Sequence, residues 1–323
     1  VAAAAEQCLM TRPIFVTGSQ RSGTSWLASV LAAGGQVAFL DEPFSHKQRD
    51  PGQCAVDFPH WFTYVGPHNG AQFAPAVGET LRLRYDLPAA LGAVRQARQL
   101  RRVWRHWRTF AGYRRRRLRP LVKQPTGLFM AEWLAETFGA QVLVVIRHPA
   151  GYVSSRLRLG WPHDFNDFLD QPALMAAYLA PLEDEFRQCQ AAAWPLLDQL
   201  ALLWKALYGT VRQLQAAHPD WLFVRYEDVA ADPAGQFSQL YAALGLDYNQ
   251  AASQAVVGSS SASNPGEVAV AQWKSVQRHS QAAAKTWQTR LTPAQIDQIR
   301  ARTAPVGGFF YDDEAWLIED ASR

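Results

Sequence analysis

A short segment near the start of the chain combines two glycines with several side chains that bind anions. Gly18 and Gly23 enclose Ser-Gln-Arg-Ser, and Thr24 and Ser25 follow at once. Glycines let the backbone approach an anion closely, and the unpaired N–H groups at a helix start can donate to it. The spacing is that of a Walker A loop, but Thr24 stands in place of the lysine, and the basic residue is Arg21. The pattern predicts a phosphate-binding loop unlike an ordinary ATP or GTP loop.

A second anion-binding pattern follows the most apolar run of the chain, residues 141–146. Arg147 comes directly after this run, and Ser154 and Ser155 lie in the segment that follows. A single arginine after a buried strand is explained by a structural ion pair. Two arginines at strand ends favour two contacts with one ligand that carries two anionic groups.

A pair of carboxylates occupies a third strand end. Asp41-Glu42-Pro43-Phe44 follows the apolar run 36–40. Groups just beyond the carboxyl ends of parallel strands line the ligand crevice of an α/β sheet. We therefore favour a functional role for this pair over the plainer alternative of a solvated turn.

The elements that must position these groups alternate between strand and helix. Apolar runs ending in polar residues predict strands at 13–18, 36–40, 121–125, 141–146 and 221–226, with helical segments after the first, third, fourth and fifth. Residues 45–87, which follow the second strand, are rich in proline, glycine and histidine, and we expect them to be irregular. This order predicts an α/β fold: a three-layer P-loop-like domain with a central parallel sheet of about five strands flanked by helices. We expect one domain over residues 1–323, with 1–12 disordered or a processing remnant and 45–120 a substrate-covering insertion.

The composition limits the class of protein. Hydrophobic residues make up 48% of the 323 residues, which is enough for a sizeable core. No apolar run reaches the length of a transmembrane helix. The cysteines, Cys8, Cys54 and Cys189, are too far apart for a metal pattern, and they suit a reducing cytoplasm.

The basic residues are concentrated in one segment. Residues 95–119 hold eleven arginines and no acidic residue, whereas the rest of the chain has 21 basic and 28 acidic residues. We expect a helix over 88–111, with Leu100, Val103, Trp104 and Trp107 on one stripe and arginines on another. Three alternatives remain open: a solvated helix with its tryptophans packed inward, contact with an anionic membrane surface, and contact with an acidic substrate such as a polysaccharide. Nucleic acid is not expected, because no recognition motif accompanies the charge.

Taken together, these motifs resemble the sulfotransferases that use 3′-phosphoadenosine 5′-phosphosulfate (PAPS) and release 3′-phosphoadenosine 5′-phosphate (PAP). The resemblance extends over residues 13–311. Gly18-Ser-Gln-Arg-Ser-Gly-Thr-Ser-Trp-Leu resembles the 5′-phosphosulfate loop of the family. Arginine rather than lysine at position 21 indicates the carbohydrate and bacterial branches. The resemblance implies that the loop cradles the 5′-phosphosulfate with Arg21, Ser22, Gly23, Thr24 and Ser25, and that Trp26 lies near the adenine.

Other motifs of the resemblance concern the 3′-phosphate and the adenine. Arg147 and Ser155 have the spacing of the family's 3′-phosphate motif, and Tyr226-Glu-Asp resembles its tyrosine contact to adenine. Arg278 and Ser280 are the counterparts of a late 3′-phosphate segment, although the spacing differs from that of the cytosolic members. The resemblance implies no metal.

The catalytic base is not where cytosolic members have it. They use a histidine just after strand three, and this chain has Lys123-Gln124-Pro125 there. Glu42 resembles the Glu-Pro element of carbohydrate and bacterial members. We therefore expect Glu42, in preference to Asp41, to accept the proton of the acceptor hydroxyl, with Lys123 as an assisting cation and Arg21 stabilising charge in the transition state.

Two other functions remain as alternatives. A P-loop small-molecule kinase requires a lysine after Gly23 and an aspartate that binds Mg²⁺. A protein that only binds anionic surfaces explains residues 95–119 and leaves both phosphate motifs without a role. The sequence does not identify the acceptor, a carbohydrate or another small molecule with a hydroxyl group, or the oligomeric state.

Overall fold

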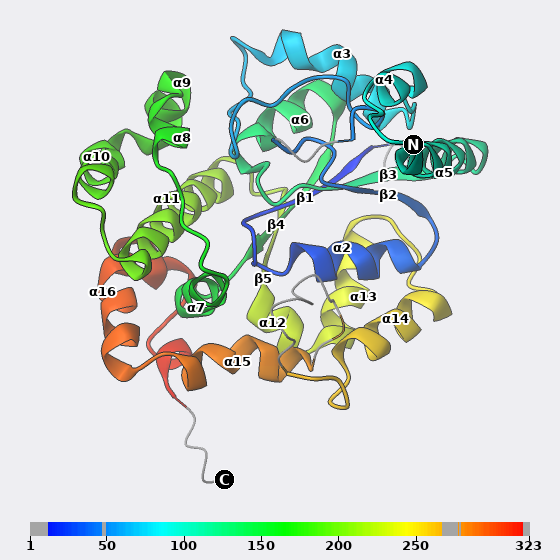
Figure 1. Cartoon of the computed structure of the whole chain (residues 1–323). Coiled ribbons are helices and arrows are strands. Elements are labelled where there is room, and N and C mark those ends of the chain that lie inside the picture. Colours follow the sequence, from blue (N-terminus) through cyan, green and yellow to red (C-terminus); the bar gives the residue numbers. More distant parts are fainter. Residues whose placement is uncertain (1–11, 47–49, 267–276, 278, 319–323) are drawn as a thin grey trace. The chain divides into compact units, whose positions relative to one another are not determined.

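The computed structural model describes residues 12–46, 50–266, 277 and 279–318. Five strands form one parallel sheet in the order β2-β3-β1-β4-β5 (Figure 1). They are β1 (Ile14–Thr17), β2 (Val37–Asp41), β3 (Arg119–Lys123), β4 (Gln141–Ile146) and β5 (Leu222–Arg225). The predicted fold class and all five predicted strands are confirmed. The expected disorder or processing of residues 1–12 concerns a segment that, except for Arg12, lies outside the described residues.

The described chain divides into two compact units. The first consists of residues up to Thr17, Leu27–Leu143 and Phe237–Ala255, and the second of Gly18–Trp26, Val144–Gln236 and the residues from Val256 on. The prediction of a single domain over 1–323, with an insertion over 45–120, stays a prediction.

The first unit is built around three apolar strands. β3 lies between its two parallel neighbours, with Val16 of β1 and Asp41 of β2 both in register with Lys123. Figure 1 shows α3 and α6 on one face of these strands and α2 on the other. The helices are α2 (Thr24–Ala33), α3 (Gly70–Leu81), α4 (Leu87–Gly92), α5 (Ala97–Arg115) and α6 (Ala131–Phe138), with a 3₁₀ turn at Leu128–Met130 before α6. Gly139 ends α6 in the left-handed conformation (φ +64°), as its sequence position predicts.

The second unit is mainly helical. Its largest helix, α11 (Leu196–Ala217), packs against α7 and α16, and α15 packs against α7 and α12. The apolar residues that repeat along α11, among them Leu200, Trp204 and Leu207, are fully buried. The other elements of this unit are α7 (Pro149–Leu159), α8 (Asn166–Leu169), α9 (Pro172–Leu174), α10 (Glu183–Ala192), α12 (Tyr226–Ala231), α15 (Ser280–Arg290) and α16 (Pro293–Phe310), with short turns at Met175–Leu179, Ala180–Leu182 and Glu314–Trp316. Two helices, α13 (Pro233–Ala243) and α14 (Gln250–Ser260), contain residues of both units.

Two local predictions are wrong. Residues 45–87 were expected to be irregular because they are rich in proline and glycine, yet α3 forms there with Pro75 inside it. Phe73, Val77 and Thr80 are buried at helical spacing, and this burial outweighs the hydrogen bond that Pro75 cannot make. The single helix expected over 88–111 is divided into α4 and α5.

The inner face of α5 also differs from the predicted stripe. Val103 is buried, but Leu100, Trp104 and Trp107 are each more than one third exposed. The buried face instead contains Val103 and Phe110. The helix is attached through His106, whose Nδ1 lies 2.5 Å from a carboxylate oxygen of Asp50. The tryptophans therefore do not pack inward.

None of the helices described is long and apolar enough to cross a membrane. The expected cytoplasmic location stays a prediction.

Candidate active site

The backbone of the loop after β1 requires glycine at two positions. Gly18 has φ +146°, and a Cβ there would lie 2.4 Å from the carbonyl oxygen of Val145. Gly23 has φ +102°, and a Cβ there would lie 2.3 Å from the ring of Tyr226. Any larger residue would meet both steric overlap and an unfavourable backbone conformation. The two glycines thus fix the path of the loop.

Arg21 connects the two predicted anion-binding motifs. Its backbone has φ +72°, a left-handed conformation that costs a residue with a Cβ about 1–2 kcal/mol. Its Nε donates a hydrogen bond of 3.1 Å to Oγ of Ser155, near the middle of α7. The structure therefore brings together a residue of the first motif and a residue of the second.

Serine hydroxyls and a buried tyrosine hold the loop in shape. Oγ of Ser22 donates to the carbonyl of Ser19 at 2.7 Å, and the hydroxyls of Ser19 and Tyr208 lie 2.8 Å apart. Tyr208 also accepts a hydrogen bond from the backbone N–H of Arg147 at 3.2 Å. Burial raises the pKa of the Tyr208 phenol well above its ordinary value, so the hydroxyl stays protonated. Tyr208 thus ties both motifs to α11, a role that the sequence did not indicate.

Arg147 is almost completely buried and faces several groups of the second unit. Its guanidinium lies 3.8 Å from the centre of the Tyr226 ring, and its Nη2 donates to the carbonyl of Ala283 at 3.1 Å. Its Nε is 3.3 Å from a carboxylate oxygen of Glu227, at an angle that makes no hydrogen bond. A buried N–H of a charged group without an acceptor is costly. The Nε–H group of Arg147 could donate a hydrogen bond to an anionic ligand.

His148, the next residue, is enclosed by aromatic rings. Its imidazole stacks on Trp287 with the ring centres 5.0 Å apart, and the rings of Tyr311 and Trp316 lie within 4.8 Å. Neither ring nitrogen has a hydrogen-bond partner among the described residues. Burial, with a smaller effect of the Arg147 charge, lowers the pKa of His148 to about 3. The imidazole is therefore neutral and adds no charge beside Arg147.

Two aromatic residues predicted to lie near adenine meet in the same unit. The rings of Trp26 and Tyr226 are edge to face, with centres 5.7 Å apart. Nε1 of Trp26 donates to Oγ of Ser259 at 2.9 Å. Tyr226 is the first residue of α12, so the turn from β5 into that helix sets the position of its ring.

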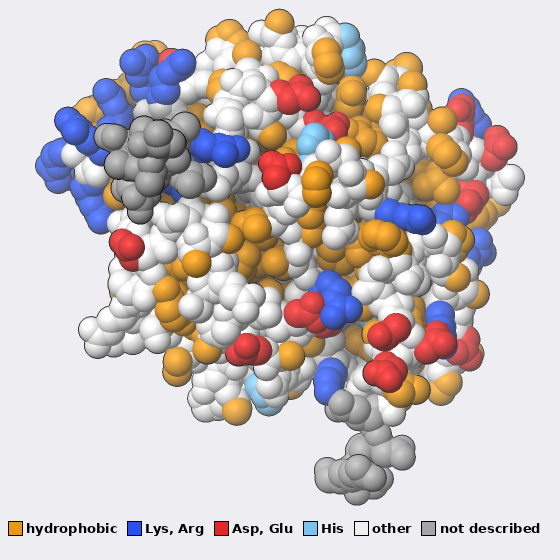
Figure 2. Space-filling view, turned by 180° about the vertical axis from the view of Figure 1, so that it is seen from behind, with side chains coloured by type: hydrophobic (Ala, Val, Ile, Leu, Met, Phe, Trp, Pro, Cys, Tyr) orange, Lys and Arg blue, Asp and Glu red, His pale blue; other side chains and the backbone are white. Residues whose placement is uncertain are grey.

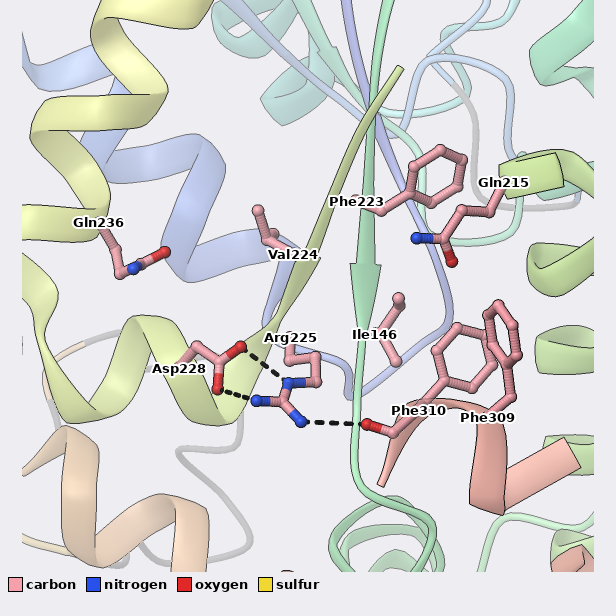
Figure 3. A pocket seen from close by; sticks show the side chains of 9 residues that line it. All are labelled: Ile146, Gln215, Phe223, Val224, Arg225, Asp228, Gln236, Phe309 and Phe310. Carbon is pink, nitrogen blue, oxygen red and sulfur yellow. Dashed lines mark hydrogen bonds and ion pairs between the residues drawn. The ribbon is translucent and has the colours of Figure 1, made fainter. Parts of the chain in front are cut away.

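Arg225 fixes this turn, as Figure 3 shows. Its guanidinium donates two hydrogen bonds of 2.7 Å to the carboxylate of Asp228, and a third of 3.0 Å to the carbonyl of Phe310. These groups line a cavity of about 380 Å³ that also contains Phe309 and Gln215. None of the predicted donor-binding residues lines this cavity, so Arg225 has a structural role one residue away from Tyr226.

Four other residues were predicted to bind the donor, and the structure describes three of them: Ser280, Thr24 and Ser25. Oγ of Ser280 donates to the carbonyl of Ala230 at 3.0 Å and so attaches α15 to α12. Thr24 is buried and Ser25 exposed, at the start of α2. Arg278 lies outside the described residues. Glu227 was named in the sequence only as part of the motif at Tyr226 and was given no role. Its position directly after the predicted strand 221–226 was a signal that could have marked it as a residue of the site.

A separate cluster in the first unit contains the predicted base. Nζ of Lys123 lies 2.6 Å from Oδ1 of Asp41 and 2.6 Å from Oε1 of Glu42. The lysine side chain is 4% exposed, whereas those of Asp41 and Glu42 are 65% and 42% exposed. The ammonium thus holds both carboxylates at the end of β2 while leaving them accessible to solvent. The predicted catalytic pair, Glu42 and Lys123, is in direct contact.

Glu42 is held in place by its surroundings. Its backbone has φ +52°, and its N–H donates to the carbonyl of Lys123 at 2.8 Å. Ser45 donates from Oγ to Oε2 at 3.4 Å. Such backbone strain is concentrated at functional sites, because surrounding contacts must sustain it. Arg21 and Glu42, both proposed from the sequence, share this feature. Among the described residues, no cluster of His, Cys, Asp and Glu could hold a metal ion.

A comparison with protein families identifies the class. The pattern of the sulfotransferase family matches residues 13–250, and the chain belongs to this family. This assignment confirms the resemblance found in the sequence and makes the chain a member of a transferase family. No curated protein sequence matches the chain.

The chain also matches solved structures, among them several sulfotransferases. The sulfotransferase domain of the Synechococcus PCC 7002 olefin synthase is 18% identical, with a TM-score of 0.46, and the match covers 94% of this chain and 96% of that one. The sulfotransferase domain from the curacin biosynthetic pathway is 13% identical, with a TM-score of 0.47 and coverages of 91% and 98%. Mouse sulfotransferase SULT7A1, complexed with PAP, is 14% identical, with a TM-score of 0.46 and coverages of 94% and 86%.

Proposed function

We propose that the chain transfers a sulfuryl group from PAPS to the hydroxyl group of a carbohydrate or other small molecule. The observation that carries the proposal is the hydrogen bond from Arg21 to Ser155. It joins the motif proposed for the 5′-phosphosulfate of the donor to the motif proposed for its 3′-phosphate. PAPS carries a 5′-phosphosulfate and a 3′-phosphate, so it requires two anion sites. An ordinary ATP-dependent kinase has no need for the second.

The described residues fit such a donor. Arg21 and the backbone N–H groups of the loop around Gly23 would hold the 5′-phosphosulfate. Arg147, with its unpaired buried Nε, and Ser155 would hold the 3′-phosphate. Trp26 and Tyr226 would contact the adenine ring. The hydroxyl of Ser280 already donates a hydrogen bond to a backbone carbonyl, so Ser280 would contribute through the helix that it begins. The proposed role of Arg278 rests on the sequence alone.

Catalysis by these residues consists of positioning and charge stabilisation. PAPS supplies an activated sulfuryl group, which passes to the acceptor oxygen as the bond from sulfur to the phosphate oxygen breaks and PAP remains. Sulfuryl transfer resembles phosphoryl transfer in this respect. Arg21 would stabilise negative charge that develops on the leaving oxygen. Arginine and backbone N–H groups supply the positive field, and we propose no metal.

Proton removal from the acceptor falls to Glu42. Its carboxylate is 42% exposed and is oriented by Lys123 and Ser45. A positioned general base contributes about 10²–10⁴-fold to the rate. Asp41 shares Lys123 but is more exposed and lacks the contact with Ser45, which supports Glu42 as the base.

The direct test uses labelled PAPS with a panel of hydroxyl acceptors, on wild-type enzyme and Arg21→Ala. We expect the variant to keep its fold and lose turnover. Turnover close to wild type in Arg21→Ala would rule out the proposed role of that arginine. ATP turnover that depends on Mg²⁺, without PAP binding, would favour the kinase alternative instead.

A further inference from the structure

The exposed face of α5 combines two kinds of side chain. Leu100, Trp104 and Trp107 recur at helical spacing, and their exposed fractions are 38%, 47% and 40%. The two tryptophan rings are edge to face, with centres 5.7 Å apart. Large apolar side chains that gather on one exposed stripe mark an interaction surface.

Arginines border this stripe. Arg98, Arg101, Arg105 and Arg108 recur at helical spacing on the neighbouring face of α5, and all are exposed. None of these four forms an ion pair in the part of the chain that the structure describes. Figure 2 shows Lys and Arg side chains gathered over this helix at the upper left. The stripe and the arginines are hereafter called the α5 surface.

The α5 surface is not needed to hold the helix in place. Val103 and Phe110 are each 5% exposed and face the unit, and His106 contacts Asp50. Tyr85 packs on Phe110 with ring centres 5.4 Å apart and donates to Asp50 at 3.1 Å. Because Val103, His106 and Phe110 already attach the inner face of α5 to the first unit, the tryptophans and arginines of the α5 surface are available to a partner outside the chain.

We propose that the α5 surface docks the protein onto an anionic phospholipid bilayer. A helix that binds in the plane of a membrane has an apolar stripe with Trp and Leu and a polar face rich in Lys and Arg. Tryptophan prefers the headgroup level, where its ring is buried and its N–H is hydrated. Arginines next to it attract acidic headgroups. A soluble polyanion would account for the arginines but gives no reason to expose Leu100.

The proposal predicts binding that depends on both halves of the α5 surface. Sedimentation with vesicles of phosphatidylcholine and phosphatidylglycerol measures it, with pure phosphatidylcholine as the neutral reference. Arg101→Gln/Arg105→Gln should weaken binding about 25-fold, at about five-fold for each basic residue. Trp104→Ala/Trp107→Ala should weaken it by about tenfold for each ring, from the apolar area withdrawn.

Matched controls remove the same groups elsewhere in the first unit. Trp61→Ala removes a tryptophan that is 39% exposed outside α5, and Arg82→Gln/Arg84→Gln removes two exposed arginines. Both should bind vesicles like wild type. All these positions are exposed, so circular dichroism should show that every variant keeps its fold.

Each other outcome overturns the proposal. If the wild-type protein does not bind acidic vesicles at low salt, the proposal is wrong. Binding that the arginine variant loses and the tryptophan variant keeps shows a purely electrostatic surface. Tighter binding to a sulfated polysaccharide than to vesicles, again unaffected by Trp104→Ala/Trp107→Ala, assigns the surface to a polyanion.

Discussion

Protonation of His148 should destabilise the protein as the pH falls. The pKa of His148 is lowered to about 3 by burial among aromatic rings and by Arg147, and the ordinary value in an unfolded chain is about 6.5. Between these values the unfolded chain binds a proton that the folded chain excludes. Stability from this residue is therefore present above about pH 6.5 and is lost progressively as the pH falls toward 3.

The size of the effect follows from the two pKa values. One excluded proton costs about 1.4 kcal/mol for each pH unit inside the window, so His148 contributes a loss of about 2 kcal/mol between pH 7 and pH 5. His163, whose pKa burial also lowers to about 3, should contribute a similar loss. Together they remove a substantial part of a typical stability of about 5–15 kcal/mol.

Denaturant titrations between pH 7 and pH 5 measure this loss in wild type and His148→Phe. Phenylalanine keeps the stacking on Trp287 and cannot be protonated, so the stability of the variant relative to wild type should rise by about 2 kcal/mol over this range. His163→Phe is the matched variant and should behave alike. A stability difference between wild type and His148→Phe that stays constant with pH would refute a buried neutral imidazole at this position.

Three further predictions concern the loop and the carboxylate cluster. Glu42→Gln should lower kcat about 10²–10⁴-fold with PAP affinity unchanged, while Asp41→Asn keeps activity; the reverse result would make Asp41 the base. Neutralising both residues strands the buried ammonium of Lys123 and should cost about 3–5 kcal/mol, more than the sum of the single changes, in a double-mutant cycle of melting curves. Gly23→Ala should cost about 1–3 kcal/mol and weaken PAP binding, and Tyr226→Ala should restore part of the loss by removing the overlapping ring; equal losses with and without Tyr226 would show that no overlap exists.

Patterns local to the chain predicted most of the fold and much of the candidate site. The apolar runs before Gly18 and Arg147 specify buried strands, and the glycines and arginines at their ends indicate anion binding without knowledge of tertiary contacts. Glu42 and Lys123 were predicted to act together although they are far apart in the sequence, and the in-register pairing of β2 with β3 brings them into contact.

Residues that act through tertiary contacts could not be found in this way. Tyr208 lies in an apolar helix, and nothing in its surroundings in sequence distinguishes it from a core residue. The orientation of Trp104 and Trp107 depends on Asp50 and Tyr85, which lie in other segments and decide which face of α5 is buried. Periodicity alone gives the stripes of a helix but not the one that packs.

The central claim, recognition of a nucleotide by its 3′-phosphate, is tested most directly by calorimetric titration with PAP and with adenosine 5′-phosphate. We expect wild type to bind PAP and to bind adenosine 5′-phosphate much more weakly. Arg147→Ala should remove this preference, because the guanidinium that faces Tyr226 is the proposed contact to the 3′-phosphate. Equal affinity of wild type for the two nucleotides, or no binding of PAP, would contradict the account.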